Sequence, residues 1–216
     1  LLKLLDSKHD ITLRTEAILA LGRMQTPSAV DPLILQFQDP DPEIRTAASH
    51  ALVHIGIDAL GPLISSLSTC DDQAAWMVHV TLAEMEGDAA REIVKNIPRL
   101  HGIGYERAGF VLNMMGTDVI PVLIDALATP DPTTIRFIEG LLETFGRAAI
   151  HHLINGLSHD NEEVRARISS LLIVLGDQVV GDLLSSCGQD EEWLRELKFY
   201  IISEIGKPAL DPLYQA

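Results

Sequence analysis

The chain has 216 residues, a formal net charge of −15, 5% aromatic residues and two cysteines. The negative charge disfavours binding to a nucleic-acid backbone, which requires clustered Lys and Arg. The sequence has no apolar run approaching the roughly 20 residues of a membrane span, and sparse cysteines are typical of a reducing compartment, so we expect a cytoplasmic protein without membrane contact.

A position that recurs along the chain divides it into repeats. It is occupied by glycine in most repeats, at intervals of 30 residues or a multiple of 30, while Gln25 and Glu86 fill the other two. The glycines are Gly56, Gly116, Gly146, Gly176 and Gly206. Leu or Ile stands four residues before this position in every repeat, and Leu or Ile also stands seven residues after it, with Leu33 displaced by one. A period of this length indicates an array of small units rather than one wrapped globule.

The repeats account for the whole chain, which we interpret as one domain over residues 1–216. The first twelve residues, 1–12, resemble the end of a preceding repeat. The repeats that follow are 13–43, 44–73, 74–103, 104–133, 134–163, 164–193 and 194–216. Because the sequence lacks an initiator Met and stops inside an expected helix, we expect it to be a fragment of a longer chain.

Each repeat is predicted to contain two short helices. Residues 164–175 carry apolar side chains at helical spacing without Gly or Pro, and Gly176 is suited to end that helix because glycine adopts positive φ without steric cost. A second amphipathic run follows from Val179 to Cys187. The pairs Asp41-Pro42 and Asp131-Pro132 are typical of a helix start. Since neither helix could bury its apolar stripe alone, neighbouring repeats must stack.

The repeat resembles the HEAT repeat, in the short variety found in phycobilisome-lyase-like proteins. Residues 44–56 follow the family pattern Val-Arg-x-x-Ala-x-x-Ala-Leu-Gly-x-Ile-Gly closely, and 29–34 match the start of its second helix. The resemblance implies an all-α fold, a right-handed α-α superhelix (α-solenoid) of about seven two-helix HEAT-like repeats of about 30 residues. It implies first helices on the convex side and second helices on the concave side. It implies no single function, because the fold hosts scaffolds, lyase subunits, hydroxylases and DNA-repair proteins.

Histidine offers the main route to an enzymatic interpretation. Deoxyhypusine hydroxylases of this repeat class bind di-iron through paired His-Glu dipeptides, and the chain contains no His-Glu dipeptide. His50 and His54 have metal-ligand spacing on a helix, but only Glu84 and His79 are near enough in sequence to complete a set. We therefore favour surface histidines, and we expect no catalytic residue, no metal and no cofactor.

Candidate partner-binding residues are those that remain on the second helices once the core positions are removed. They are Arg91, Lys95, Asn96, Asp125, His151, His152 and Asn155. Among them Arg91 and Lys95 form the only basic spot, where a partner carboxylate could dock. Trp76, in the most irregular repeat, is interpreted either as a partner-facing anchor, since Trp is enriched at binding hot spots, or as a core residue that fills space.

Acidic residues gather in the loops that join one repeat to the next, at 39–43, 71–72, 160–163 and 190–192. They are interpreted as helix caps or, alternatively, as a docking edge for a basic partner. Together these observations favour a non-catalytic protein–protein interaction scaffold that binds its partner along the concave face or the acidic edge. The alternative is a lyase-like subunit that holds a tetrapyrrole or other cofactor, and a metal-dependent oxygenase is disfavoured.

Overall fold

The structure, a computed structural model, describes residues 1–206, and every regular element in that range is a helix. The fold is therefore all-α, as the sequence predicts. The chain divides into two compact units, Leu1–Gly116 and Thr117–Ala216. The predicted repeat 104–133 is split by this division. The second helix expected after Gly206, with its core residue Leu213, lies outside the described residues.

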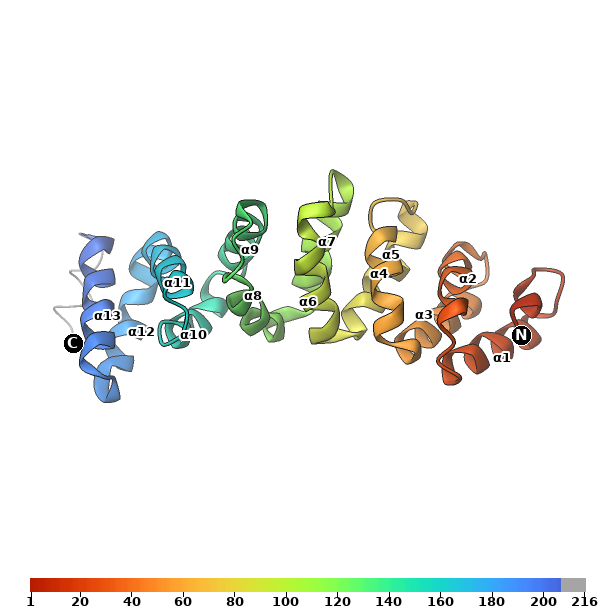
Figure 1. Ribbon diagram of the computed structural model, residues 1–216, viewed down its shortest axis with the longest axis horizontal. Helices are drawn as coiled ribbons and strands as arrows, with labels where there is room; N and C mark the ends of the chain where they lie inside the picture. The colour runs from red at the N-terminus through yellow and green to blue at the C-terminus, as the bar shows by residue number, and fades with distance from the viewer. Residues whose placement is uncertain (207–216) are drawn as a thin grey trace. The chain divides into compact units, whose positions relative to one another are not determined.

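In the first unit, long first helices alternate with second helices (Figure 1). The first helices are α1 (Ile11–Arg23), α3 (Pro42–Ile55), α5 (Asp72–Glu84) and α7 (Ile103–Met114). The second helices are α2 (Val30–Leu35), α4 (Ile57–Ser66) and α6 (Glu86–Asn96), with short 3-10 turns at Leu2–Leu5, Pro27–Ala29, Gln36–Gln38 and Ile97–Arg99. Each first helix packs on the next first helix, and α4 packs on both α2 and α6. The unit thus has two layers of helices.

The second unit repeats this arrangement. Its first helices are α9 (Pro132–Phe145), α11 (Glu162–Leu175) and α13 (Glu192–Ile205), and its second helices are α8 (Ile120–Ala126), α10 (Arg147–Gly156) and α12 (Val180–Ser185). Helix α10 packs on α8 and α12, and α11 packs on α9 and α13. The 3-10 turns Gly176–Val179 and Ser186–Gln189 flank α12. The run predicted as one second helix, from Val179 to Cys187, is therefore α-helical only in its middle.

The predicted helix starts are confirmed. Asp41 and Asp131 are the N-cap residues of α3 and α9, and a proline follows each at the first helical position. The Asp41 carboxylate accepts a hydrogen bond from the Glu43 backbone N–H at 2.8 Å, and Asp131 accepts one from the Thr134 N–H at 2.7 Å. Each cap satisfies a backbone donor that the first helical turn leaves without a partner.

The recurring glycine position is the joint between the helices, and it has positive φ throughout. Gly56 and Gly176 have φ of 77° and 69°. The residues that replace glycine, Gln25 and Glu86, also have positive φ, at 46° and 51°. Because positive φ brings Cβ close to the backbone, it is unfavourable for residues other than glycine. The shape of the repeat therefore imposes this conformation even where the sequence does not favour it.

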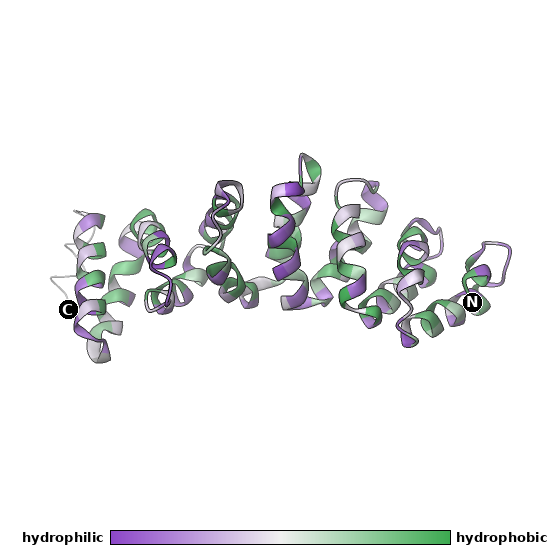
Figure 2. Ribbon diagram, viewed as in Figure 1, coloured by the Kyte–Doolittle hydropathy of each residue, from purple (hydrophilic) through white to green (hydrophobic). Residues whose placement is uncertain are grey.

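The core positions predicted from the period are buried. The Leu or Ile four residues before the joint is at most 3% exposed in every repeat, as at Leu52 and Leu172. The Leu or Ile seven residues after it is fully buried in every described case, as at Leu63 and Leu153. Figure 2 shows hydrophobic and hydrophilic residues alternating around the helices, as expected where one stripe faces the core.

Arginine stands eleven residues before the joint in four repeats, at Arg14, Arg45, Arg165 and Arg195, but it does not have one structural role. Arg45 and Arg165 each donate hydrogen bonds to the carbonyl oxygens of the residues five and six positions earlier in the chain. These bonds connect the start of the helix to the preceding loop. Arg14 is instead buried, donates to the Leu5 carbonyl at 3.2 Å and forms an ion pair with Asp39.

By length and apolar character, the helical stretch Glu162–Gly188 could cross a membrane. It consists of α11, α12 and two 3-10 turns, and the positive φ of Gly176 separates the two α-helices. Core helices of stacked arrays pass the same length test, and this stretch packs on α9, α10 and α13 through both of its α-helices.

Candidate functional site

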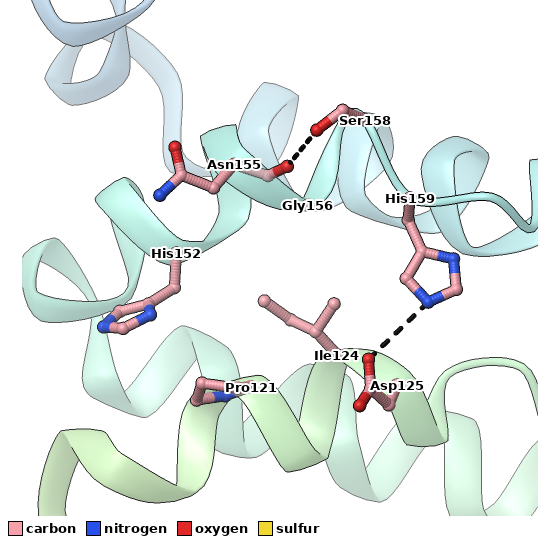
Figure 3. Close-up of a pocket in the computed structure, with 8 residues that line it drawn as sticks. All are labelled: Pro121, Ile124, Asp125, His152, Asn155, Gly156, Ser158 and His159. Atoms are coloured by element: carbon pink, nitrogen blue, oxygen red, sulfur yellow. Dashed lines mark hydrogen bonds and ion pairs between the residues drawn. The ribbon is translucent and has the colours of Figure 1, made fainter.

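A hollow on the second-helix surface lies between α8 and α10. It has a volume of about 280 Å³. Pro121, Ile124 and Asp125 line it from α8, His152, Asn155 and Gly156 line it from α10, and Ser158 and His159 line it from the following loop (Figure 3). Three of the predicted partner-binding residues, Asp125, His152 and Asn155, therefore meet in one groove.

Helical periodicity explains which side chains reach this groove. Leu123 and Leu153 occupy the same core position in successive repeats and are fully buried. Asp125 and Asn155 lie two residues further along each helix, which turns them away from the core, and both are exposed. Ile124 is 5% exposed and forms the apolar floor. The groove therefore has a polar rim and an apolar base.

A histidine–carboxylate contact spans the groove. The His159 Nε2 atom lies 3.6 Å from the Asp125 Oδ1 atom, and Figure 3 shows the imidazole ring pointing across to α8. The other ring nitrogen, Nδ1, accepts a hydrogen bond from the Asn161 backbone N–H at 3.0 Å. A neutral ring whose Nδ1 accepts must carry its proton on Nε2. The backbone of the loop thus orients the donor side of His159 toward the carboxylate.

The neighbouring polar groups are also paired. The His151 Nε2 atom lies 3.1 Å from the Asn155 side-chain nitrogen, one helical turn away. The Ser158 hydroxyl donates to the Asn155 carbonyl oxygen at 2.8 Å. Although Ser158, His159 and Asp125 line the same groove, they do not form a catalytic triad, because both nitrogens of His159 face other groups and Ser158 donates to the backbone. The arrangement offers hydrogen-bond donors and acceptors for recognition.

The predicted basic spot lies on α6, in the first unit. Arg91 and Lys95 are exposed, as expected, but each faces a carboxylate on its own helix. Arg91 lies 2.5 Å from Asp88 and Lys95 lies 3.2 Å from Glu92. Asn96 is half-buried and donates to the Glu92 carbonyl oxygen. The two cations therefore belong to locally neutral pairs.

Trp76 does not contribute to the core. Its side chain is 55% exposed on α5, a first helix, so the interpretation as a space-filling core residue is wrong. It lines a different groove, between α5 and α7.

Several residues of the α8–α10 groove were not predicted from the sequence. His159 and Ser158 lie in the loop after α10, outside the regular positions of the repeat, and Pro121 and Ile124 have the composition of ordinary helix residues. The available signal was the shared position of Asp125 and Asn155, 30 residues apart, which places them on adjacent second helices.

Within residues 1–206 no group of three or more His, Cys, Asp or Glu side chains is placed to hold a metal ion. His50 and His54 are exposed on α3. His79 lies instead in a buried position on α5, where its ring is 5.2 Å from that of Phe110.

Comparison with known proteins supports the repeat type over part of the chain. A family model for HEAT repeats matches residues 1–93, all within the first unit. No curated protein matches the chain. A solved structure of human deoxyhypusine hydroxylase in complex with glycerol is similar over 93% of this chain and 81% of the other, with 17% identity and a TM-score of 0.30. A similarity of this size supports no conclusion about activity.

Proposed function

We propose that the chain is a non-catalytic scaffold that binds a protein partner on its second-helix surface, with the groove between α8 and α10 as the contact site. The observation that carries this proposal is the groove itself, where Asp125, His152 and Asn155 surround the apolar floor of Ile124. A shallow site with an apolar base and a rim of polar side chains suits a protein segment, which supplies backbone and side-chain hydrogen bonds together.

The bonding of His159 supports recognition rather than catalysis. A general base needs a free ring nitrogen within hydrogen-bond reach of the proton that it removes. In this groove Nδ1 accepts from Asn161 and Nε2 faces Asp125, so neither nitrogen is directed at Ser158. The pairing instead fixes the shape of the groove, which favours binding to a preformed surface.

The groove is a stronger candidate than the acidic loops, because many of the loop carboxylates have structural roles. Asp41 and Asp71 accept hydrogen bonds from backbone N–H groups at the starts of α3 and α5. Asp39 and Asp190 form ion pairs with the buried cations Arg14 and Lys198. These contacts support the interpretation of the loop acids as caps and internal partners. A basic partner at this edge would compete with them.

The proposal includes a phycobilisome-lyase-like repeat subtype, favoured by the short period, and a cytoplasmic location. Cys70 and Cys187 are both free thiols, as is usual in reducing compartments. Burial raises the pKa of both thiols, and the neighbouring Arg107 and Lys198 oppose that rise. Both thiols are therefore less reactive than exposed ones.

The test is affinity capture from a lysate of the source cells, with the intact chain as bait and mass spectrometry as the readout. Wild type should capture a protein in stoichiometric amount, and the variant Asp125→Ala/His152→Ala/Asn155→Ala should lose it. Ser170→Ala is the matched control in the same unit, because this exposed hydroxyl donates only within α11 and lies on a first helix. The control should capture the partner as wild type does.

Other outcomes would overturn the proposal. A partner retained by the triple variant would move the site away from the groove. Capture of a coloured ligand without protein would favour the lyase-like alternative, in which a tetrapyrrole is held by the chain. A stoichiometric metal with turnover of a substrate would favour an oxygenase.

A further inference from the structure

A second groove lies between two first helices, α5 and α7, whereas the α8–α10 groove lies between two second helices. The volume of the α5–α7 groove is about 460 Å³. Trp76 projects into it from α5, and Ile103 and Phe110 project into it from α7. These three large apolar side chains are 55%, 49% and 48% exposed, respectively. Single exposed apolar residues are common, but a cluster in a groove marks an interaction surface.

The HEAT-like repeat does not require this cluster. The positions equivalent to Trp76 in the other first helices of the chain are Thr15, Thr46, Glu106, Arg136, Ala166 and Glu196. The positions equivalent to Phe110 are Leu19, His50, Val80, Gly140, Ser170 and Tyr200. The position of Trp76 is thus polar or small in every other first helix, and the position of Phe110 is polar or small in three, so the stacking of helices does not require aromatic side chains here. In a chain with only 5% aromatic residues, such a cluster occurs here and again three repeats later, where Trp193 and Tyr200 line the groove between α11 and α13.

The base of the groove contains an unsatisfied polar atom. His79 is 8% exposed and lines the groove, with its ring packed against Phe110. Its Nε2 atom is buried and has no hydrogen-bond partner among the described residues. A buried polar nitrogen without a partner is unfavourable, because it has lost its hydrogen bonds to water and gained none in the protein. A polar group of a bound segment that approaches the ring along the groove would supply the missing hydrogen bond.

The rim of the groove is negative. Arg107 is the only Lys or Arg among the described lining residues, and its buried guanidinium donates to the Asp72 carboxylate at 2.8 Å. That carboxylate is 99% exposed, so the negative partner of the pair faces solvent while the positive one does not. Glu106 is also exposed and forms no ion pair with any described residue. A positively charged ligand is therefore favoured.

We propose that the groove between α5 and α7 is a docking site for a basic protein segment that inserts one large apolar side chain between the two helices. Trp76, Ile103 and Phe110 bury the anchor, and Glu106 attracts the flanking Lys or Arg residues. This site is independent of the α8–α10 groove and lies on first helices. An exposed Trp beside an apolar base is the usual composition of a binding hot spot.

The test uses random 12-residue peptides displayed on phage. They are selected on the intact chain and counter-selected on the Trp76→Ser/Phe110→Ser variant. The enriched peptides should combine one Trp, Phe, Leu or Met with two or more Lys or Arg residues. Fluorescence anisotropy of the best synthetic peptide should show about thirtyfold weaker binding to the double variant, the loss expected for a central aromatic anchor. Glu106→Lys should weaken binding about tenfold, with a shallower salt dependence.

Leu35→Ser is the matched control, because Leu35 is an exposed apolar residue of a second helix in the same unit. This variant should bind the peptide as wild type does. Circular dichroism melting shows whether each variant is folded. If the double variant does not fold, protection of α5 and α7 amides from hydrogen exchange on adding the peptide to wild type provides the second measurement.

Any of the following results would overturn the proposal. The first is a selection that enriches no sequence on wild type over the double variant, or that enriches acidic peptides or peptides without an apolar residue. The second is a selected peptide that binds the double variant and wild type equally, or that protects amides outside α5 and α7 from hydrogen exchange. The third is self-association of wild type in sedimentation that Trp76→Ser abolishes, because the occupant would then be a second copy of the chain.

Discussion

The groove between α5 and α7 has a counterpart three repeats later, between α11 and α13. Every lining residue of one is 90 positions from a lining residue of the other. Trp193 occupies the position of Ile103, and Tyr200 that of Phe110. The same backbone positions in the two units thus form two grooves with exposed aromatic side chains.

The two grooves differ in how their side chains are satisfied. The Trp193 Nε1–H donates to the Glu191 carboxylate at 2.7 Å, and the Arg165 guanidinium lies 5.7 Å from the Trp193 ring centroid. Ser169, at the position of His79, donates its hydroxyl to the Arg165 carbonyl oxygen. In the α5–α7 groove, by contrast, the His79 Nε2 atom has no described partner. The lack of a hydrogen bond at His79 therefore depends on which side chain occupies this position, and not on the backbone of the repeat.

The largest expected difference concerns the buried cation beside each groove. Lys198 is paired with Asp190, whose side chain is only 16% exposed, whereas Arg107 is paired with the fully exposed carboxylate of Asp72. Asp190→Ala leaves a buried ammonium group without its counter-charge and should lower the free energy of unfolding by about 3–5 kcal/mol. Asp72→Ala should cost at most about 1 kcal/mol. Urea denaturation measures both losses, and equal losses would contradict the inference that the Lys198–Asp190 pair is more deeply buried than the Arg107–Asp72 pair.

His79 should make the first unit sensitive to acid. Burial, and to a smaller extent the Arg107 charge, lowers the pKa of His79 below the ordinary histidine value of about 6.5. As pH falls below about 6.5, the unfolded chain takes up a proton that the folded chain resists, so this stability is present above about pH 6.5 and is lost below it. His79→Phe should reduce the loss of stability between about pH 7.5 and about pH 5.5, measured by urea denaturation. An unchanged loss would show that His79 is protonated as easily in the folded chain.

The joint after α5 offers a smaller effect. Glu86 has a φ of 51°, and its equivalent in the second unit is Gly176, with a φ of 69°. Glu86→Gly should relieve this strain and raise the free energy of unfolding by about 1 kcal/mol. Gly176→Ala should lower it by a similar amount or more. Thermal and urea denaturation measure both variants, and a destabilised Glu86→Gly variant would mean that the Glu86 side chain has a stabilising role.

The smallest effect is expected at Glu191. Glu191→Ala removes an exposed hydrogen bond and should change the free energy of unfolding by no more than about 0.5 kcal/mol. It should nevertheless release the Trp193 ring. In a Trp76→Phe background Trp193 is the only tryptophan, so time-resolved fluorescence anisotropy reports its motion directly. A faster local decay is expected, and an unchanged decay would show that Arg165 alone holds the ring.

Much of the fold follows from the sequence, because its signals repeat. Positions such as Leu52 and Leu63 indicate the core, and Asp41-Pro42 indicates a helix start without any long-range information. The exposure of Asp125 and Asn155 follows from the same helical spacing. These features depend on residues within one or two turns of each other, so their periodicity is visible in a single chain.

The remaining features depend on contacts that do not repeat. His159 reaches Asp125 from a loop, and its orientation is set by the Asn161 backbone, which no side-chain pattern reveals. Trp76 was ambiguous in the sequence because its repeat is irregular, and its exposure excludes the core interpretation. The division of the chain after Gly116 falls within one sequence repeat, so the period alone did not indicate it.

Arg107 also has a consequence for the order of folding. Its guanidinium donates to the Leu67 and Cys70 carbonyl oxygens, 40 and 37 residues earlier in the chain, and to Asp72, 35 residues earlier. Because α5 and α6 lie between these partners, the loop that the bonds close must first be shortened by forming both helices. We therefore expect these bonds to form after the rate-limiting step. Contacts of this kind slow unfolding without accelerating folding, so Arg107 protects the first unit mainly by prolonging the lifetime of its folded state.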